Sequence, residues 1–203
     1  MKVENVQIKN RYVIGVHVMF FEIEMFSEYT DGLINLIDPV KNKENITLDF
    51  CFNLSEHLEE IDDRRISKDE LLNKFNTQIE ILKTKYPMIK IVTKIHNTED
   101  GVYYHADYRR DLNYNYCKKV DYVMWGETDS FFPKEAFLVI ESLETYTNEH
   151  DLHKFILSFS DRKMWDSSWD PLVHVEYKSH VFVDDEKGHL NPNQAKSQLS
   201  IED

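Results

Sequence analysis

Segments typical of β-strands and segments typical of α-helices alternate along this chain, and this alternation restricts its fold more than any other feature. YVIGVHVMF at 12–20 is rich in β-branched and aromatic residues, and ITLDFCF at 46–52 places apolar residues at every second position, as strands do. Between them, FSEYTDGLINLI at 26–37 suits a helix that ends before Pro39. Strands that alternate with helices are typical of a mostly parallel sheet covered by helices.

The same alternation continues beyond residue 60. The clearest helix begins at Ser67, where Ser67 and Glu70 have the spacing of a capping box and apolar residues then recur at helical intervals until Pro87. The later elements are expected to be a strand at 88–95, a helix at 105–118, a strand at 120–125, a helix with Pro133 in its first turn, and strands at 154–159 and 173–183.

The predicted fold class is therefore α/β, with a mostly parallel sheet and helices on both faces. We expect a single domain over residues 1–183, followed at 184–203 by a polar segment that is a disordered tail or the cut end of a longer protein.

Composition and charge narrow the class of protein. Apolar residues make up 41% of the 203 residues, and the chain has only 5 glycines and 5 prolines, as in a packed globular protein. The formal net charge of −13 argues against a nucleic-acid partner, whose phosphates are bound by Lys and Arg. No segment has the length of a transmembrane span or the pattern of a signal peptide, and the two cysteines have neither disulfide nor metal spacing. We therefore expect a soluble, cytoplasmic protein.

The segment VDYVMWGETDSFFP at 120–133 runs from an apolar strand into two acids, Glu127 and Asp129, and then into Pro133. Ligands of open α/β sheets bind beyond the carboxyl ends of the strands, so the end of this strand is a candidate site. If the chain stays extended there, both carboxylates point to the same side and suit Mg²⁺ or Mn²⁺. The alternative is a solvated acidic turn, in which Glu, Thr, Asp and Ser are ordinary residues.

This segment, VDYVMWGETDSFFPKEAF, resembles the metal-binding segment of nucleotide-sugar glycosyltransferases of the GT-A fold, especially the large family-two group. There, an apolar strand ends in Asp-x-Asp and a proline opens the next helix. HADYRRDLNYNYCKK stands upstream at nearly the spacing of that family's Arg-Asn pair, and ITLDFCFNLSEH matches its second strand in position. The resemblance extends over roughly residues 10–145 and implies a GT-A, Rossmann-like nucleotide-binding fold.

The resemblance implies a metal-dependent and inverting transfer of a sugar from a nucleotide-diphosphate sugar to an unknown acceptor. Mn²⁺ or Mg²⁺ would be held by Glu127 and Asp129, with His174 as a further ligand. A position on the solvated face of an edge strand is an equal alternative for His174. Arginines of the upstream segment are expected to contact phosphate, although ion pairs with Asp107 or Asp111 on the helix surface are an equal alternative. The residues expected to bind the nucleotide are Asn53, Ser55, Arg109 and Arg110.

An inverting transfer also needs a carboxylate base near the acceptor hydroxyl. The loop SDRKMWDSSWDPLVH supplies the candidates Asp166 and Asp170, with Asp161 as a third. Trp165 and Trp169 flank these acids and are expected to bind the acceptor, because flat rings cover the apolar face of a sugar. The alternative for the two tryptophans is packing in the core or under a lid.

Differences from the family pattern leave two other functions open. Glu127 replaces the first Asp, the second strand ends in Asn53-Leu54-Ser55 where the family has adjacent acids, and MFFEIEMF replaces the ending Pro-x-Tyr-Asn. A non-catalytic relative that binds nucleotide sugars is therefore one alternative. A metal-dependent hydrolase or phosphoesterase that uses the same acids with His174, His180 and Asp184 or Asp185 is the other. His17, inside the first strand, is expected to be a hydrogen-bonded core histidine.

Overall fold

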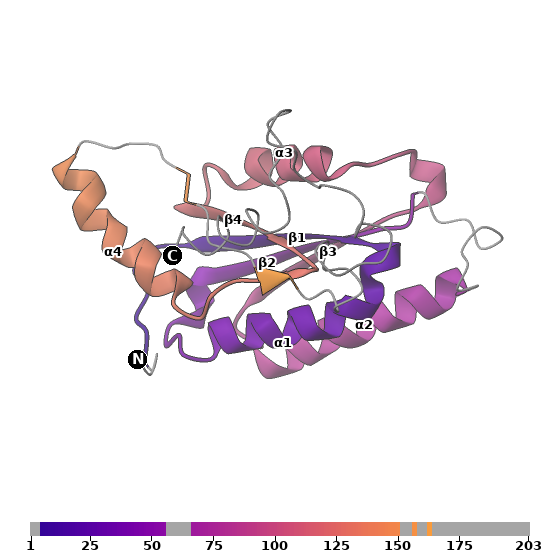
Figure 1. Ribbon diagram of the computed structural model, residues 1–203, viewed down its shortest axis with the longest axis horizontal. Coiled ribbons are helices and arrows are strands. Elements are labelled where there is room, and N and C mark those ends of the chain that lie inside the picture. The colour runs from indigo at the N-terminus through magenta and orange to yellow at the C-terminus, as the bar shows by residue number, and fades with distance from the viewer. Residues whose placement is uncertain (1–4, 56–65, 151–155, 158–161, 164–203) are drawn as a thin grey trace, which may run out of the picture. The chain divides into compact units, whose positions relative to one another are not determined.

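The centre of the protein is a four-stranded sheet whose strands all run parallel (Figure 1). The computed structural model describes residues 5–55, 66–150, 156–157 and 162–163, and the chain divides into two units, Met1–Phe159 and Ser160–Asp203. The sheet belongs to the first unit. Its strands are β1 (Tyr12–Met19), β2 (Ile46–Asn53), β3 (Lys90–His96) and β4 (Tyr122–Glu127), in the order β3-β2-β1-β4.

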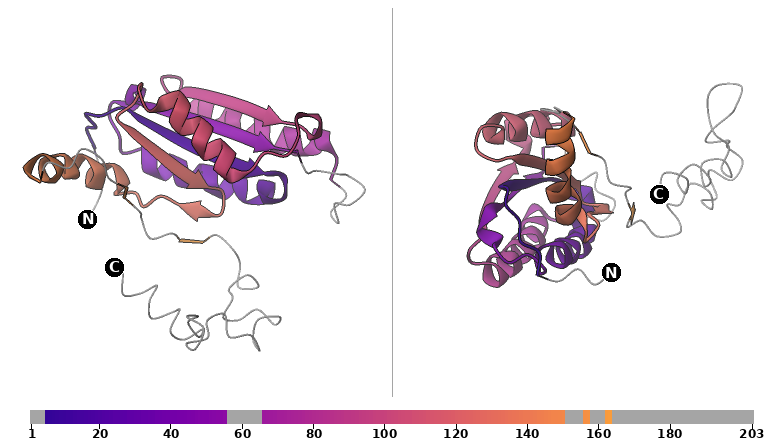
Figure 2. Two further views of the ribbon diagram at one scale, coloured as in Figure 1. Left: turned by 90° about the horizontal axis from the view of Figure 1, so that it is seen from above. Right: turned by 90° about the vertical axis from the view of Figure 1, so that its left-hand side faces the viewer.

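Helices connect these strands and cover both faces of the sheet. α1 and α2 lie on one face, and α3 lies on the other (Figures 1 and 2). The α/β class and the parallel sheet that the alternation predicts are therefore confirmed. The helices and short elements are η1 (Phe20–Met25), α1 (Phe26–Ile37), η2 (Lys43–Asn45), α2 (Lys68–Lys85), η3 (Thr98–Asp100), α3 (His105–Tyr116), β5 (Ser130–Phe131), α4 (Ala136–Glu149) and β6 (Arg162–Lys163).

Aromatic side chains fill the layer between the sheet and the helices α1 and α2. Phe50 and Phe52 of β2 are fully buried, as the alternation in ITLDFCF predicts. The ring of Phe75 in α2 stacks on Phe52 with centroids 4.8 Å apart and on Phe26 of α1 at 5.3 Å. α2 begins as expected at Ser67, whose Oγ accepts a hydrogen bond from the Glu70 N–H at 3.2 Å.

Helix α3 packs closely against β1 because β1 has a glycine beneath it. A Cβ at Gly15 would lie 2.2 Å from Cδ2 of Leu112, so no larger residue fits without moving the helix. Asp49 of β2 anchors the same helix: it accepts hydrogen bonds from the hydroxyls of Tyr108 at 3.1 Å and Tyr116 at 2.8 Å. The helix that begins at His105 is therefore fixed in position over β1 and β2.

Two expectations about the later elements differ from the structure. Pro133 lies before α4 rather than in its first turn, because its carbonyl accepts from the Ala136 N–H at 2.9 Å in a turn that precedes the helix. Ile156 and Leu157 are the described part of the strand expected at 154–159, and they are not in a strand. The strand expected at 173–183 and the boundary at 183 lie outside the described residues. Of the helices that the structure describes, none combines the length and apolar character of a membrane span.

Candidate functional site

The strand order reverses direction between β1 and β4, which makes the carboxyl ends of these strands the natural ligand site. From β1 the chain proceeds through α1 to β2 on one side, whereas β4 pairs with the other side of β1. Open α/β sheets bind ligands in the crevice at such a switch point. In the register of the sheet, Glu127 of β4 lies directly opposite His17 of β1.

The two predicted acids stand at this point, but they belong to different local structures. β4 ends at Glu127, and Thr128 and Asp129 lie in the turn that follows. Side-chain alternation therefore does not extend to Asp129, and the argument that both carboxylates share one face of a strand does not apply. Asp129 is buried, with 7% of the residue exposed. Gly126 allows β4 to lie close to Tyr29 of α1, because a Cβ at Gly126 would lie 2.0 Å from the hydroxyl of Tyr29.

The structure brings Arg109 and Glu127 together. Arg109 lies one helical turn after His105 in α3, and its Nη2 donates to Oε1 of Glu127. Both side chains are partly exposed, at 43% and 37% respectively. Ion pairs with this much solvent contact contribute about 0.2–1 kcal/mol, so the Arg109–Glu127 pair is weak enough to be exchanged for another partner.

Arg110 takes the alternative that the sequence also allows. Its guanidinium lies 2.8 Å from Oδ1 of Asp107 and 3.9 Å from Asp111, and 70% of its side chain is exposed. These contacts are helix-surface ion pairs within α3. Of the two neighbouring arginines, Arg109 is therefore the one that reaches the end of β4.

Glu22 is a site residue that the sequence interpretation did not include. It lies in η1, directly after β1, where its Oε2 accepts from the hydroxyl of Thr128 and, at 3.3 Å, from the N–H of Met19. Burial raises the pKa of the Glu22 carboxyl, and the negative charge of Asp129 also raises it. The sequence does contain a signal for Glu22: it is an acid that follows a buried strand within three residues. The carboxyl ends of parallel strands lie at one edge of the sheet, so such an acid is a candidate site residue.

His17 lies beneath the site in its neutral form. The Asn53 side chain donates from Nδ2 to Nε2 of His17 at 3.1 Å and to the carbonyl of Tyr103, while its Oδ1 accepts from the Ser55 N–H at 2.9 Å. The orientation of this amide leaves Nε2 of His17 as an acceptor and its proton on Nδ1. Burial, with smaller effects of His105, His96 and Arg109, lowers the pKa of His17 to about 3. The expected hydrogen-bonded core histidine is confirmed.

Asn53 and Ser55, the residues expected at the nucleotide, stand at the carboxyl end of β2. Asn53 is fully buried and holds His17, whereas Ser55 is 6% exposed. Next to them, the rings of His96 and Tyr103 stack with centroids 4.0 Å apart. The described site thus consists of a polar buried part at β2 and β3, and a charged part at β1 and β4.

The charged part has the donor atoms that a hard divalent cation prefers. Glu22, Glu127 and Asp129 are carboxylates, and Mg²⁺ and Mn²⁺ take oxygen ligands. Within residues 5–55, 66–150 and the two short described segments, however, no three His, Cys, Asp or Glu side chains gather closely enough to hold a metal ion. His174, Asp166, Asp170, Trp165 and Trp169 lie outside the described residues, as do Asp161, His180, Asp184 and Asp185. The donor chemistry fits the cation, and a complete ligand set requires more than these carboxylates.

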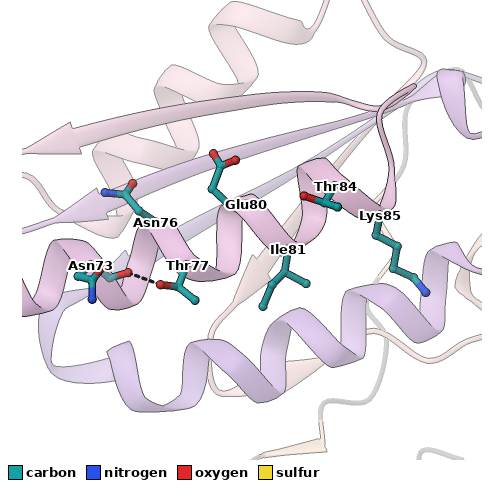
Figure 3. Close-up of a pocket in the computed structure, with 7 residues that line it drawn as sticks. All are labelled: Asn73, Asn76, Thr77, Glu80, Ile81, Thr84 and Lys85. Carbon is teal, nitrogen blue, oxygen red and sulfur yellow. Dashed lines mark hydrogen bonds between the residues drawn. The ribbon is translucent and has the colours of Figure 1, made fainter.

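A surface hollow on α2 is separate from these residues. Figure 3 shows its lining side chains along one helix, with a hydrogen bond from the Thr77 hydroxyl to the Asn73 carbonyl that is internal to that helix. None of the strand-end residues lines it. Its lining residues are Asn73, Asn76, Thr77, Glu80, Ile81, Thr84 and Lys85.

The fold and the site together define an α/β protein with a parallel sheet and a charged switch point. Comparisons of the chain with protein-family models, with curated proteins and with solved structures found no match.

Proposed function

We propose that the protein is a metal-dependent glycosyltransferase that moves a sugar from a nucleotide-diphosphate sugar to an acceptor. The observation that carries the proposal is the pairing of Arg109 with Glu127, next to Asp129, at the switch point of the sheet. A cation-binding carboxylate and a phosphate-binding guanidinium are the two groups that a diphosphate ligand requires. The resemblance of residues 120–137 to the metal-binding segment of GT-A enzymes supports the same assignment.

The chemistry explains why both kinds of charge are needed. Transfer breaks a glycosyl–phosphate bond, and negative charge develops on the departing diphosphate. A divalent cation bound at Asp129 and Glu127 would neutralise part of this charge as a Lewis acid. Arg109 would bind a phosphate oxygen with its planar, permanently charged guanidinium. We assign the nucleotide to the adjoining end of β2, where Asn53 and Ser55 lie.

The acceptor half of the site stays a prediction from the sequence. Asp166 or Asp170 would serve as the base that removes the acceptor proton in an inverting reaction, and Trp165 and Trp169 would bind the acceptor. A third cation ligand would come from His174.

Ligand-induced stabilisation tests the proposal. We expect Mn²⁺ together with a UDP-sugar or a GDP-sugar to raise the midpoint of thermal unfolding, because a ligand that binds only the folded state stabilises it. In Asp129→Ala this rise should be lost, with a fall in affinity of at least about ten-fold, equivalent to roughly 1.4 kcal/mol. Asp31→Asn, which changes an exposed acid in α1, is the matched control and should respond as the wild type does.

Three outcomes would contradict the proposal in different ways. Stabilisation by the cation alone, together with phosphatase turnover, would indicate the hydrolase. Binding of a nucleotide sugar without transfer to water or to any acceptor would indicate the non-catalytic relative. A response that survives in Asp129→Ala would exclude this strand end as the site.

A further inference from the structure

The Arg109–Glu127 pair joins two groups to which the proposed function gives different ligands. Glu127 is assigned to the cation and Arg109 to the diphosphate, yet in the structure Nη2 of Arg109 donates to Oε1 of Glu127. The Arg109 guanidinium would bind phosphate and the Glu127 carboxylate would bind the cation, and in this contact the two groups bind each other. Each ligand would therefore compete with a residue of the protein for part of its own binding group.

We propose that Arg109 and Glu127 exchange partners when the substrate binds, so that the cation and the diphosphate each lower the cost of binding the other. The inference rests on the proposed function and describes how that site is regulated. Coupling of this kind is reciprocal: the factor by which the cation improves diphosphate binding equals the factor by which the diphosphate improves cation binding.

The charges around the pair explain why each ligand is expected to bind more weakly alone than together with the other. If only the cation binds Glu127, the displaced guanidinium remains as a positive charge beside it. If only the diphosphate binds Arg109, the negative Glu127 carboxylate stays near the anion, at a strand end where the charges of Glu22 and Asp129 already interact. When both ligands bind, each charge has an opposite charge as its partner.

The strength of the pair sets the size of the effect. Both side chains are more than one-third exposed, and pairs of this kind contribute about 0.2–1 kcal/mol. Breaking the pair by mutation should therefore improve the binding of the remaining single ligand by roughly 1.5- to 5-fold.

A double-mutant cycle with inorganic pyrophosphate in the presence of a metal chelator isolates the exchange. We expect Glu127→Gln to bind pyrophosphate roughly 1.5- to 5-fold more tightly than the wild type in isothermal titration, because Arg109 is released. In the Arg109→Gln background the same substitution should bring no gain, because no guanidinium remains to be released. A gain that persists in that background would show simple charge repulsion and would overturn the exchange.

Manganese binding without any nucleotide gives the complementary measurement. Arg109→Gln should bind Mn²⁺ more tightly than the wild type by a similar factor, since Arg109 no longer competes with the cation for Glu127. Arg11→Gln is the matched control: it breaks the partly exposed Arg11–Asp121 pair at the opposite end of β4 and should leave Mn²⁺ affinity unchanged. Equal effects of Arg109→Gln and Arg11→Gln, or no effect of Arg109→Gln, would also overturn the exchange.

The outcomes separate this inference from the function on which it rests. If the wild type binds Mn²⁺ and a nucleotide sugar but the variants show no gain in affinity for either single ligand, the exchange is contradicted and the proposed function is not. If the wild type binds none of Mn²⁺, pyrophosphate and a nucleotide sugar, both the proposed function and the exchange are contradicted. Thermal unfolding of each variant without ligand verifies that it is folded.

Discussion

His17 shows how a single buried residue is fixed in one protonation state. Its Nε2 accepts from Asn53, so the ring cannot carry a second proton without losing this hydrogen bond. Burial opposes the charged form as well, and His105, His96 and Arg109 add to the effect. A histidine in this state supports the sheet beneath the site rather than exchanging protons in it.

This protonation state predicts a specific pH dependence of stability. The pKa of His17 is about 3 in the folded protein, whereas an unfolded histidine has a pKa of about 6.5. Its contribution is fully present above the unfolded value and is lost as the pH falls from about 6.5 towards 3, because the unfolded chain binds the proton more readily. We expect the free energy of unfolding, measured with urea, to fall less between pH 7 and pH 4 in His17→Gln than in the wild type. An unchanged pH dependence in His17→Gln would contradict the assignment of His17 as a neutral, buried group.

At the scale of elements, one side chain connects the loops after β1 and β4. Thr128, fully buried in the turn after β4, donates its hydroxyl to Glu22 in η1. The two loops flank the switch point, and Asp129 follows Thr128 directly. The contact therefore connects the turn that contains Asp129 to η1.

Substitutions at Thr128 test this contact. Thr128→Val keeps the shape of the side chain but removes the donor, so we expect it to lower the affinity for Mn²⁺ with a nucleotide sugar by roughly 5- to 30-fold, about 1–2 kcal/mol. Thr128→Ser keeps the hydroxyl and should restore most of the affinity. Isothermal titration measures both. A loss of affinity in the Ser variant without a loss in the Val variant would show that packing of the methyl group, and not the hydrogen bond, matters at this position.

The sequence predicted the elements better than their contacts. Strands and helices between Tyr12 and Glu149 follow from periodicity, capping and proline positions, which are local signals. The contacts of the site are not local: Arg109 and Glu127 are 18 residues apart, and Glu22 and Thr128 are 106 apart. Periodicity does not specify the order of strands in a sheet, and this order is what brings Glu22 beside the turn after β4.

At the scale of the whole molecule, the described sheet and helices belong to one of two units. In the part of the chain that the structure describes, the strands from β1 to β5 and the helices α1 to α4 lie within Met1–Phe159. We expect a fragment of these residues to unfold cooperatively by itself in a urea titration followed by circular dichroism, because its core of buried apolar residues is contained in it. A fragment that lacks a cooperative transition would show that residues after Phe159 are required for folding.

The position of β4 has a consequence for how a ligand would affect the protein. Among the described strands, β4 pairs only with β1, so one of its edges has no described partner. In local unfolding of a native protein, strands at the edge of a sheet lose their hydrogen bonds more readily than central strands do. A substrate that bound Asp129 and Glu127 and also contacted β1 and β2 would stabilise the position of β4 in the sheet. Binding and local rigidity would then rise together, and the substrate itself would become part of the scaffold that holds it.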